Sequence, residues 1–156
     1  ATLPFPLQGV AGGTPKRGVA GMHWYLVAIG GAVGATIRYG AYLWVDGRVS
    51  NSSDSIIAQL PGIAGTWLVN VIGCLLIGLI SGALGDRIFT DGRLRAFLVV
   101  GLFGGFTTMS ALGLESWNLF RDGQLLKGIS LSMIQTMLCV LMVGLGIGVG
   151  KFLKVS

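Results

Sequence analysis

Charged residues are scarce in this sequence. They make up 11% of its 156 residues, whereas hydrophobic residues make up 53%. Soluble domains carry roughly 25% charged residues, so the composition excludes an ordinary soluble domain. With a mean hydropathy of +0.78, the chain is expected to be a multi-pass protein of the cell membrane, surrounded by lipid.

The residues that carry most enzyme chemistry are also few. The one histidine is His23, so no metal site can be built from histidines. The two cysteines, Cys74 and Cys139, lie in apolar runs, where a free cysteine behaves as a small hydrophobic residue, and no disulfide is expected. The sequence has no plausible catalytic triad, no CxxC pair and no phosphate-binding loop followed by lysine. These absences argue against an enzyme.

A dense basic patch is missing as well. The formal net charge is +5, but the lysines and arginines are scattered singly between apolar blocks. Nucleic acid is therefore not an expected partner of this chain.

What the sequence does contain is four long apolar blocks. They cover residues 24–45, 63–84, 96–120 and 126–150. Each block is long enough to cross roughly 30 Å of hydrocarbon as a helix. The sequence thus predicts an all-α membrane protein with four transmembrane helices. Residues 22–156 are expected to form one domain, preceded by a flexible N-terminal tail, residues 1–21, that is rich in glycine and proline.

The basic residues are distributed unequally between the two sides of the predicted bundle. An even number of spans puts both termini and the 85–95 loop on one side. That side carries Lys16, Arg17, Arg87, Arg93, Arg95, Lys151 and Lys154, and the other carries Arg48, Arg121 and Lys127. The positive-inside rule therefore predicts that both termini are cytoplasmic.

Glycine is abundant, at 27 residues, and recurs at four-residue spacing. The pairs are Gly30 and Gly34, Gly78 and Gly82, Gly101 and Gly105, and Gly144 and Gly148. Small residues at this spacing let helix backbones approach closely in a membrane, which predicts a tight, oligomeric bundle. The alternative is that glycine is simply common in membrane helices.

Strongly polar side chains interrupt the first and second blocks. Arg38 can line a water-filled vestibule that attracts an anion, or it can snorkel to an interface or cap backbone carbonyls of another helix. Asn70 can donate its amide to an anion, or it can bond across a helix interface. The sequence alone does not select between these alternatives.

The third block contains the stretch GLFGGFTTMSALGLES, residues 101–116. Its glycines and adjacent threonines predict a third helix that is broken in mid-membrane, which is tolerated only where the backbone is buried in protein or lines a cavity. Freed carbonyls suit a small hard cation such as Na⁺, whereas hydroxyls and asparagine amides suit an anion. The alternative is a kinked helix whose hydroxyls bond to their own turn. Glu115, near the end of the stretch, is expected at the membrane interface.

Taken together, three segments resemble the small fluoride-channel family known as Fluc or CrcB. They are GGAVGATIRYG with Arg38, GTWLVNVIGCLLIG with Asn70, and GLFGGFTTMSALGLES, and the resemblance covers residues 24–153. It implies an antiparallel, dual-topology dimer of four-helix subunits, with two narrow fluoride pores and a structural Na⁺ at the dimer centre. The carbonyls that hold this Na⁺ in the family match those of Gly104 and Thr107.

The same resemblance assigns an ion pathway. Asn70 matches the pore-lining asparagine and Arg38 the first-helix arginine, while Thr108 and Ser110 belong to the GG-x-TT-x-S core of the family signature. Fluoride is small and strongly hydrated, so a pore must replace its water with hydrogen-bond donors.

The sequence also departs from the family pattern. Met109 and Leu112 stand where the family has two phenylalanines whose ring edges are held to coordinate fluoride. The polar track of the fourth helix aligns with Gln135, Cys139 and Val143, of which Gln135 alone keeps strong hydrogen-bonding capacity.

The resemblance implies a subunit of a fluoride-selective channel that lowers cytoplasmic fluoride by passive export. A homodimer inserted in both orientations needs almost no Lys/Arg bias, whereas the bias here favours one orientation. The first alternative is therefore a non-conducting or half-pore subunit of a heterodimer with a homologous second chain. The second is a small four-helix multidrug transporter, which needs a membrane-embedded carboxylate in the first span, and residues 24–45 contain none.

Overall fold

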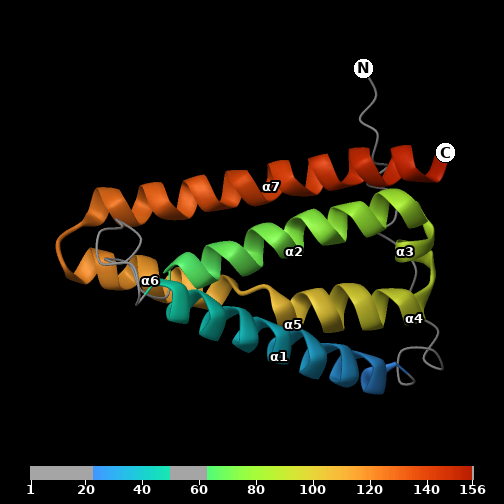
Figure 1. Cartoon of the computed structure of the whole chain (residues 1–156), viewed down its shortest axis with the longest axis horizontal. Coiled ribbons are helices and arrows are strands. Elements are labelled where there is room, and N and C mark those ends of the chain that lie inside the picture. Colours follow the sequence, from blue (N-terminus) through green and yellow to red (C-terminus); the bar gives the residue numbers. More distant parts are fainter. Residues whose placement is uncertain (1–22, 50–62, 156) are drawn as a thin grey trace, which may run out of the picture.

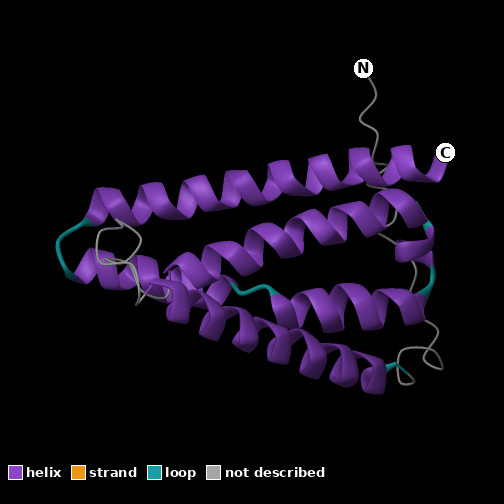
Figure 2. Ribbon diagram, in the orientation of Figure 1, coloured by secondary structure: helices purple, strands orange, loops and turns teal. Residues whose placement is uncertain are grey.

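The described part of the protein is helical throughout its length, apart from short connections. The computed structural model describes residues 23–49 and 63–155, and none of these residues is in a strand (Figure 2). Within them, four helical segments are long and apolar enough to cross a membrane: Trp24–Arg48, Ile63–Leu84, Gly92–Arg121 and Leu125–Lys154. The predicted all-α architecture with four spans is confirmed at this level. The predicted tail, residues 1–21, lies outside the described residues.

Three of the four spans are single helices and the third is composite. The single helices are α1 (Trp24–Val49), α2 (Ile63–Leu84) and α7 (Leu125–Val155). The third span follows the one-turn helix α3 (Arg87–Thr90) and consists of α4 (Gly92–Leu94), the π-helix η3 (Arg95–Phe103), α5 (Gly104–Phe106) and α6 (Met109–Arg121). Helix α1 runs four residues beyond the predicted block, and α7 continues to Val155.

Caps and a glycine turn explain where the third span begins and ends. The Asp91 carboxylate accepts hydrogen bonds from the amides of Arg93 (2.8 Å) and Leu94 (3.3 Å), which starts the span four residues before the apolar block. The turn after α6 contains Gly123 at φ +75°, a conformation that glycine adopts without strain. The chain then reverses directly into α7.

The four spans alternate in direction along the bundle (Figure 1). The start of α1 and the end of α7 lie at the same end as the 85–95 connection. A Cβ atom at Gly92 would lie 3.6 Å from the His23 ring, and one at Gly85 would lie 3.5 Å from Lys154 Nζ. The turn between α6 and α7 lies at the opposite end, beside the end of α1 and the start of α2.

Glycine lets α2 pack directly against the backbone of α7. A Cβ at Gly78 would collide with the Val143 carbonyl, and one at Gly82 would collide with the Ile147 carbonyl. The second contact lies four residues further along both helices, so α2 and α7 run parallel in a fixed register. Small residues at four-residue spacing allow this close approach.

The glycines of α7 that make this contact are not the predicted pair. Gly144 and Gly148 face open space in the described chain, whereas a Cβ at Gly146 or Gly150 would collide with the backbone of α2. The glycines that face α2 are therefore two residues away from the predicted pair and lie on a different face of α7, and a contact of Gly144 and Gly148 with a second copy stays a prediction.

The third span changes its packing partner along its length. Its first half lies against α1, where Gly101 approaches Gly30 so closely that an added Cβ would lie 3.0 Å from the Gly30 Cα. Its second half, α6, lies against α7, where the hydroxyls of Ser116 and Ser132 are 2.6 Å apart. The change of partner occurs between Phe106 and Met109.

Candidate functional site

Two residues with extended backbone separate α5 from α6. Thr107 has φ −82° and ψ 160°, and Thr108 has φ −148° and ψ 115°. Thr108 also caps α6, because its Oγ1 accepts a hydrogen bond from the Ala111 amide (3.3 Å) and lies 3.1 Å from Ser110 Oγ. We refer to Thr107 and Thr108 as the extended segment.

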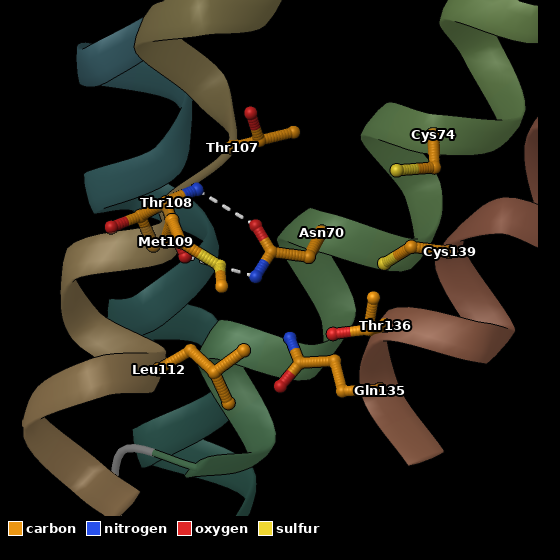
Figure 3. Close-up of a pocket in the computed structure, with 9 residues that line it drawn as sticks. All are labelled: Asn70, Cys74, Thr107, Thr108, Met109, Leu112, Gln135, Thr136 and Cys139. Carbon is orange, nitrogen blue, oxygen red and sulfur yellow. Dashed lines mark hydrogen bonds between the residues drawn. The ribbon is translucent and has the colours of Figure 1, made fainter. Parts of the chain in front are cut away.

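Asn70, on α2, pairs with the extended segment through both ends of its amide (Figure 3). Its Oδ1 accepts from the Thr108 amide at 2.7 Å, and its Nδ2 donates to the Thr108 carbonyl at 3.0 Å. The side chain is 7% exposed. Of the two sequence-based alternatives for Asn70, the structure shows the bond across a helix interface, which gives the backbone polar groups of Thr108 the partners that a helix would have supplied.

Arg38, on α1, reaches the same segment from the other side. Its Nη1 donates to the Thr107 carbonyl at 3.1 Å. In a continuous helix that carbonyl would accept from the Ala111 amide, which here donates to Thr108 instead. Arg38 therefore caps a carbonyl of another helix, one of the alternatives left open for it.

The carbonyls predicted to hold Na⁺ are among those that the extended segment deprives of helical partners. The Thr108 amide would donate to the Gly104 carbonyl in a continuous helix, but it donates to Asn70. The Thr107 carbonyl accepts from Arg38 and retains a second lone pair. Carbonyl oxygens are hard ligands, so Gly104 and Thr107 fit a hard monovalent cation. One chain supplies only part of a coordination shell from these two atoms.

A cavity of about 220 Å³ lies between the extended segment and the α2–α7 pair. It is lined by Asn70, Cys74, Thr107, Thr108, Met109, Leu112, Gln135, Thr136 and Cys139 (Figure 3). The structure thus brings together five of the seven residues of the predicted ion pathway. Arg38 and Ser110 are not among the lining residues.

The lining residues differ in how they meet the cavity. Met109 is 72% exposed and lies where the cavity meets the surface, whereas Leu112 is 2% exposed. Gln135 is fully buried and donates from Nε2 to the Thr66 carbonyl at 3.4 Å. Its Oε1 has no hydrogen-bond partner among the described residues. The donors that the lining offers an anion are consequently few.

A polar cluster next to the cavity was not predicted from the sequence. The buried Thr66 hydroxyl donates to Glu115 Oε1 at 2.5 Å, and it lies 3.0 Å from the Tyr42 hydroxyl. Since the single Thr66 proton goes to Glu115, Tyr42 is the donor in the second bond. These three residues tie α1, α2 and α6 together. The signal in the sequence was the threonine of GT-x₃-N, one turn before Asn70.

Replacing Thr66 with valine, which keeps the shape and removes the hydroxyl, is expected to lower stability by about 1–3 kcal/mol, because Glu115 and Tyr42 lose a buried partner. Thermal unfolding in detergent measures the change as a lower Tm. The control is Thr36→Val, since the Thr36 hydroxyl is exposed and bonds only to Ala32 of its own helix. Equal Tm values for the two variants would contradict the assigned role of the cluster.

Comparison with known proteins identifies relatives of this chain. Residues 25–147 match the model of the family described as CrcB-like protein, Camphor Resistance (CrcB). A protein of Chloroflexus aurantiacus named fluoride-specific ion channel FluC is 36% identical over 129 residues, which cover 81% of this chain and 93% of the relative. Proteins of the same name from Hahella chejuensis and Thermus thermophilus are 33% and 37% identical over 131 and 133 residues. These matches cover 84% and 82% of this chain, and 96% and 93% of the relatives.

The match includes α1, α2, the extended segment and most of α7, and therefore the whole cavity. The relatives are named as ion channels, which are not enzymes. With its four membrane-spanning helices, this chain belongs to the CrcB-like family of multi-pass membrane proteins, the family of the fluoride-specific ion channels.

Proposed function

We propose that this chain is a subunit of a fluoride-selective channel and lowers cytoplasmic fluoride by passive export. Its family and the names of its relatives support this function. The observation that carries the proposal is the pairing of Asn70 with Thr108, because it holds an interruption of the third span open beside a cavity lined by the predicted pathway residues. We take this interruption as the break in mid-membrane that the sequence predicts.

The assembly that we propose is a dimer of antiparallel subunits with two pores and one structural sodium ion at its centre. Gly104 is exposed on a single chain, so its carbonyl is accessible to an ion shared with a second copy. The carbonyls of Gly104 and Thr107 from both subunits would hold the ion, which supplies positive charge at the meeting point of the two extended segments. No step of ion transfer passes through it.

Hydrogen-bond donors near the cavity would replace the water of fluoride. The hydroxyls of Thr108 and Ser110 lie next to each other, and either can turn its proton outward. The Asn70 amide keeps one of its two N–H groups for a further acceptor. Arg38 contributes positive charge from behind the extended segment without lining the cavity.

We also propose that the end of the bundle with the 85–95 connection faces the cytoplasm. Among the described residues this end carries Arg87, Arg93, Arg95, Lys151 and Lys154, and the opposite end carries Arg48, Arg121 and Lys127. The excess of positive charge at the first end supports this orientation.

Fluoride efflux from liposomes that contain this chain alone tests the function. A fluoride electrode records the efflux, and the same liposomes loaded with chloride provide the control. Rapid efflux that is selective for fluoride supports a channel formed by this chain. Equal rates for the two anions, from protein that is folded and inserted, would refute fluoride selectivity.

A second candidate is a half-pore subunit that conducts only with a homologous partner chain. It is favoured by Met109 and Leu112, because neither side chain offers the electropositive ring edge of phenylalanine to an anion. No fluoride efflux from the chain alone, together with efflux when a related chain is co-reconstituted, would support this candidate. Crosslinking that finds only homodimers, fully active alone, would eliminate it.

Restoring phenylalanine at both positions, as Met109→Phe with Leu112→Phe, is expected to raise fluoride efflux by about tenfold or more, since each 1.36 kcal/mol of barrier corresponds to a factor of ten. The cavity has room for the larger ring at Leu112. The matched control is Leu114→Phe, an exposed position of α6 outside the cavity. Equal rates for the double variant and the control would argue against a role for these positions.

A further inference from the structure

Three sulfur-containing side chains line the cavity. Cys74 comes from α2, Cys139 from α7 and Met109 from the start of α6. Figure 3 shows the two cysteine side chains next to each other on one side of the cavity, with Met109 across from them. Both cysteines are free thiols and half-buried. Both line the cavity, but neither is among the residues assigned above to the ion pathway.

The two cysteines face each other because of the register of α2 and α7. Gly78 contacts Val143 and Gly82 contacts Ile147 through the backbone. Cys74 and Cys139 lie one helical turn before Gly78 and Val143 respectively, so they form the preceding pair in the same parallel register. The backbone contacts leave these helices little freedom to slide, and the two thiols are therefore held together before any ligand arrives.

We propose that Cys74, Cys139 and Met109 form a binding site for a soft monovalent cation with a filled d shell, of the class of Cu(I) and Ag(I). Thiolate and thioether sulfur are the ligands that select such ions, whereas Mg²⁺ and Ca²⁺ require oxygen. The described residues that line the cavity include no carboxylate and no histidine that would favour another metal. Met109 has a flexible side chain and lies where the cavity opens, so its sulfur can close over an ion bound by the cysteines.

The charge balance favours a monovalent ion. When the cation binds, one thiol forms the metal–sulfur bond and releases its proton to water, while the second cysteine and the methionine coordinate as neutral ligands. The bound unit then carries no net charge. A neutral unit avoids the cost of placing an unpaired charge in an apolar cavity. Binding of one cation is therefore accompanied by the release of one proton.

Silver ion is the probe, used with the full chain in detergent and with nitrate as the only counter-anion. Equilibrium dialysis followed by elemental analysis is expected to find one tightly bound Ag⁺ per chain. Cys74→Ser and Cys139→Ser are each expected to weaken binding by more than about 100-fold, because loss of an outer-shell partner alone costs about 10–100-fold in metal affinity. Met109→Leu is expected to weaken it less.

The control is Met137→Leu, at an exposed position of α7 that does not line the cavity. Unchanged binding in the Cys74→Ser, Cys139→Ser double variant would overturn the proposal, as would equal losses for Met109→Leu and Met137→Leu. X-ray absorption at the silver edge gives a test on the unmodified chain. A first shell of sulfur alone is expected, and a shell of oxygen or nitrogen would overturn the site.

The proposed metal site and the proposed channel function can be refuted independently of each other. A chain that binds Ag⁺ as described but releases no fluoride from liposomes, alone or with a partner chain, would refute the proposed function and leave the site in place. A chain that conducts fluoride and binds no Ag⁺ would refute the metal site and leave the proposed function in place. If both hold, Ag⁺ is expected to block efflux in the unmodified chain and to have no such effect on the double cysteine variant, whose efflux is compared with and without Ag⁺.

Discussion

Replacing Asn70 with aspartate is expected to reduce fluoride efflux by about 100-fold or more, on the scale where each 1.36 kcal/mol of barrier is a factor of ten. The change places a carboxylate oxygen against the Thr108 carbonyl, where Nδ2 now donates at 3.0 Å. It also adds a negative charge at the wall of the cavity, which repels an entering anion. Efflux from liposomes, read by a fluoride electrode, measures the effect.

The matched control is Asn118→Asp, the same chemical change at an exposed position of α6 outside the cavity. It is expected to leave efflux within about twofold, because Asn118 lies in the last turn of α6 and does not line the cavity. Near-equal rates for the two variants would show that Asn70 does not contribute to the ion pathway. Thermal unfolding of Asn70→Asp separates loss of conduction from loss of fold.

Replacing Gly78 with alanine is expected to lower the stability of the protein by disturbing the packing of α2 against α7. The added methyl group meets the Val143 carbonyl, which is backbone and cannot turn aside. Overpacking of this kind costs about 1–3 kcal/mol, which for a chain of this size corresponds to a Tm lower by about 2–12 °C. Thermal unfolding in detergent, followed by circular dichroism, measures the shift.

Gly144→Ala provides the opposite case on the facing helix. No atom lies within 4 Å of a Cβ built at this position. Alanine is more favourable than glycine in a helix interior by about 1 kcal/mol, so this variant is expected to keep or slightly raise the Tm. A lower Tm for Gly144→Ala than for Gly78→Ala would mean that the register of α2 and α7 described here is wrong.

The extent of the four spans follows from the sequence because it depends on local properties. Long apolar runs with few charges predict membrane-spanning helices wherever they occur, and the second block coincides with Ile63–Leu84. The predicted blocks end before α1 and α7 do, because the last turns of these helices are polar enough to resemble loops. A run of nine residues in a π-helix, η3, had no signal in the apolar pattern.

The contacts of the candidate site depend on residues far apart in the chain. Asn70 was selected as a lone amide in an apolar block, yet its partner lies 38 residues away, and only packing determines that it meets Thr108. Glu115 was expected at the membrane interface, and its hydrogen bond to Thr66, 49 residues away in the sequence, was not predicted. In α7, glycine occupies four alternate positions from 144 to 150, and nothing local tells which of them face α2.

The exchange of partners along the third span has a mechanical consequence. Its first half packs against α1 and its second half packs against α7, so Thr107 and Thr108 connect two parts of the chain that have different neighbours. The cavity lies at the junction of these two parts, between the extended segment and the α2–α7 pair. Because backbone contacts fix α2 against α7 and α1 against the first half of the third span, the width of the cavity depends on how these two helix pairs lie relative to each other. The double hydrogen bond of Asn70 and the contacts among Tyr42, Thr66 and Glu115 hold these helix pairs in place relative to each other.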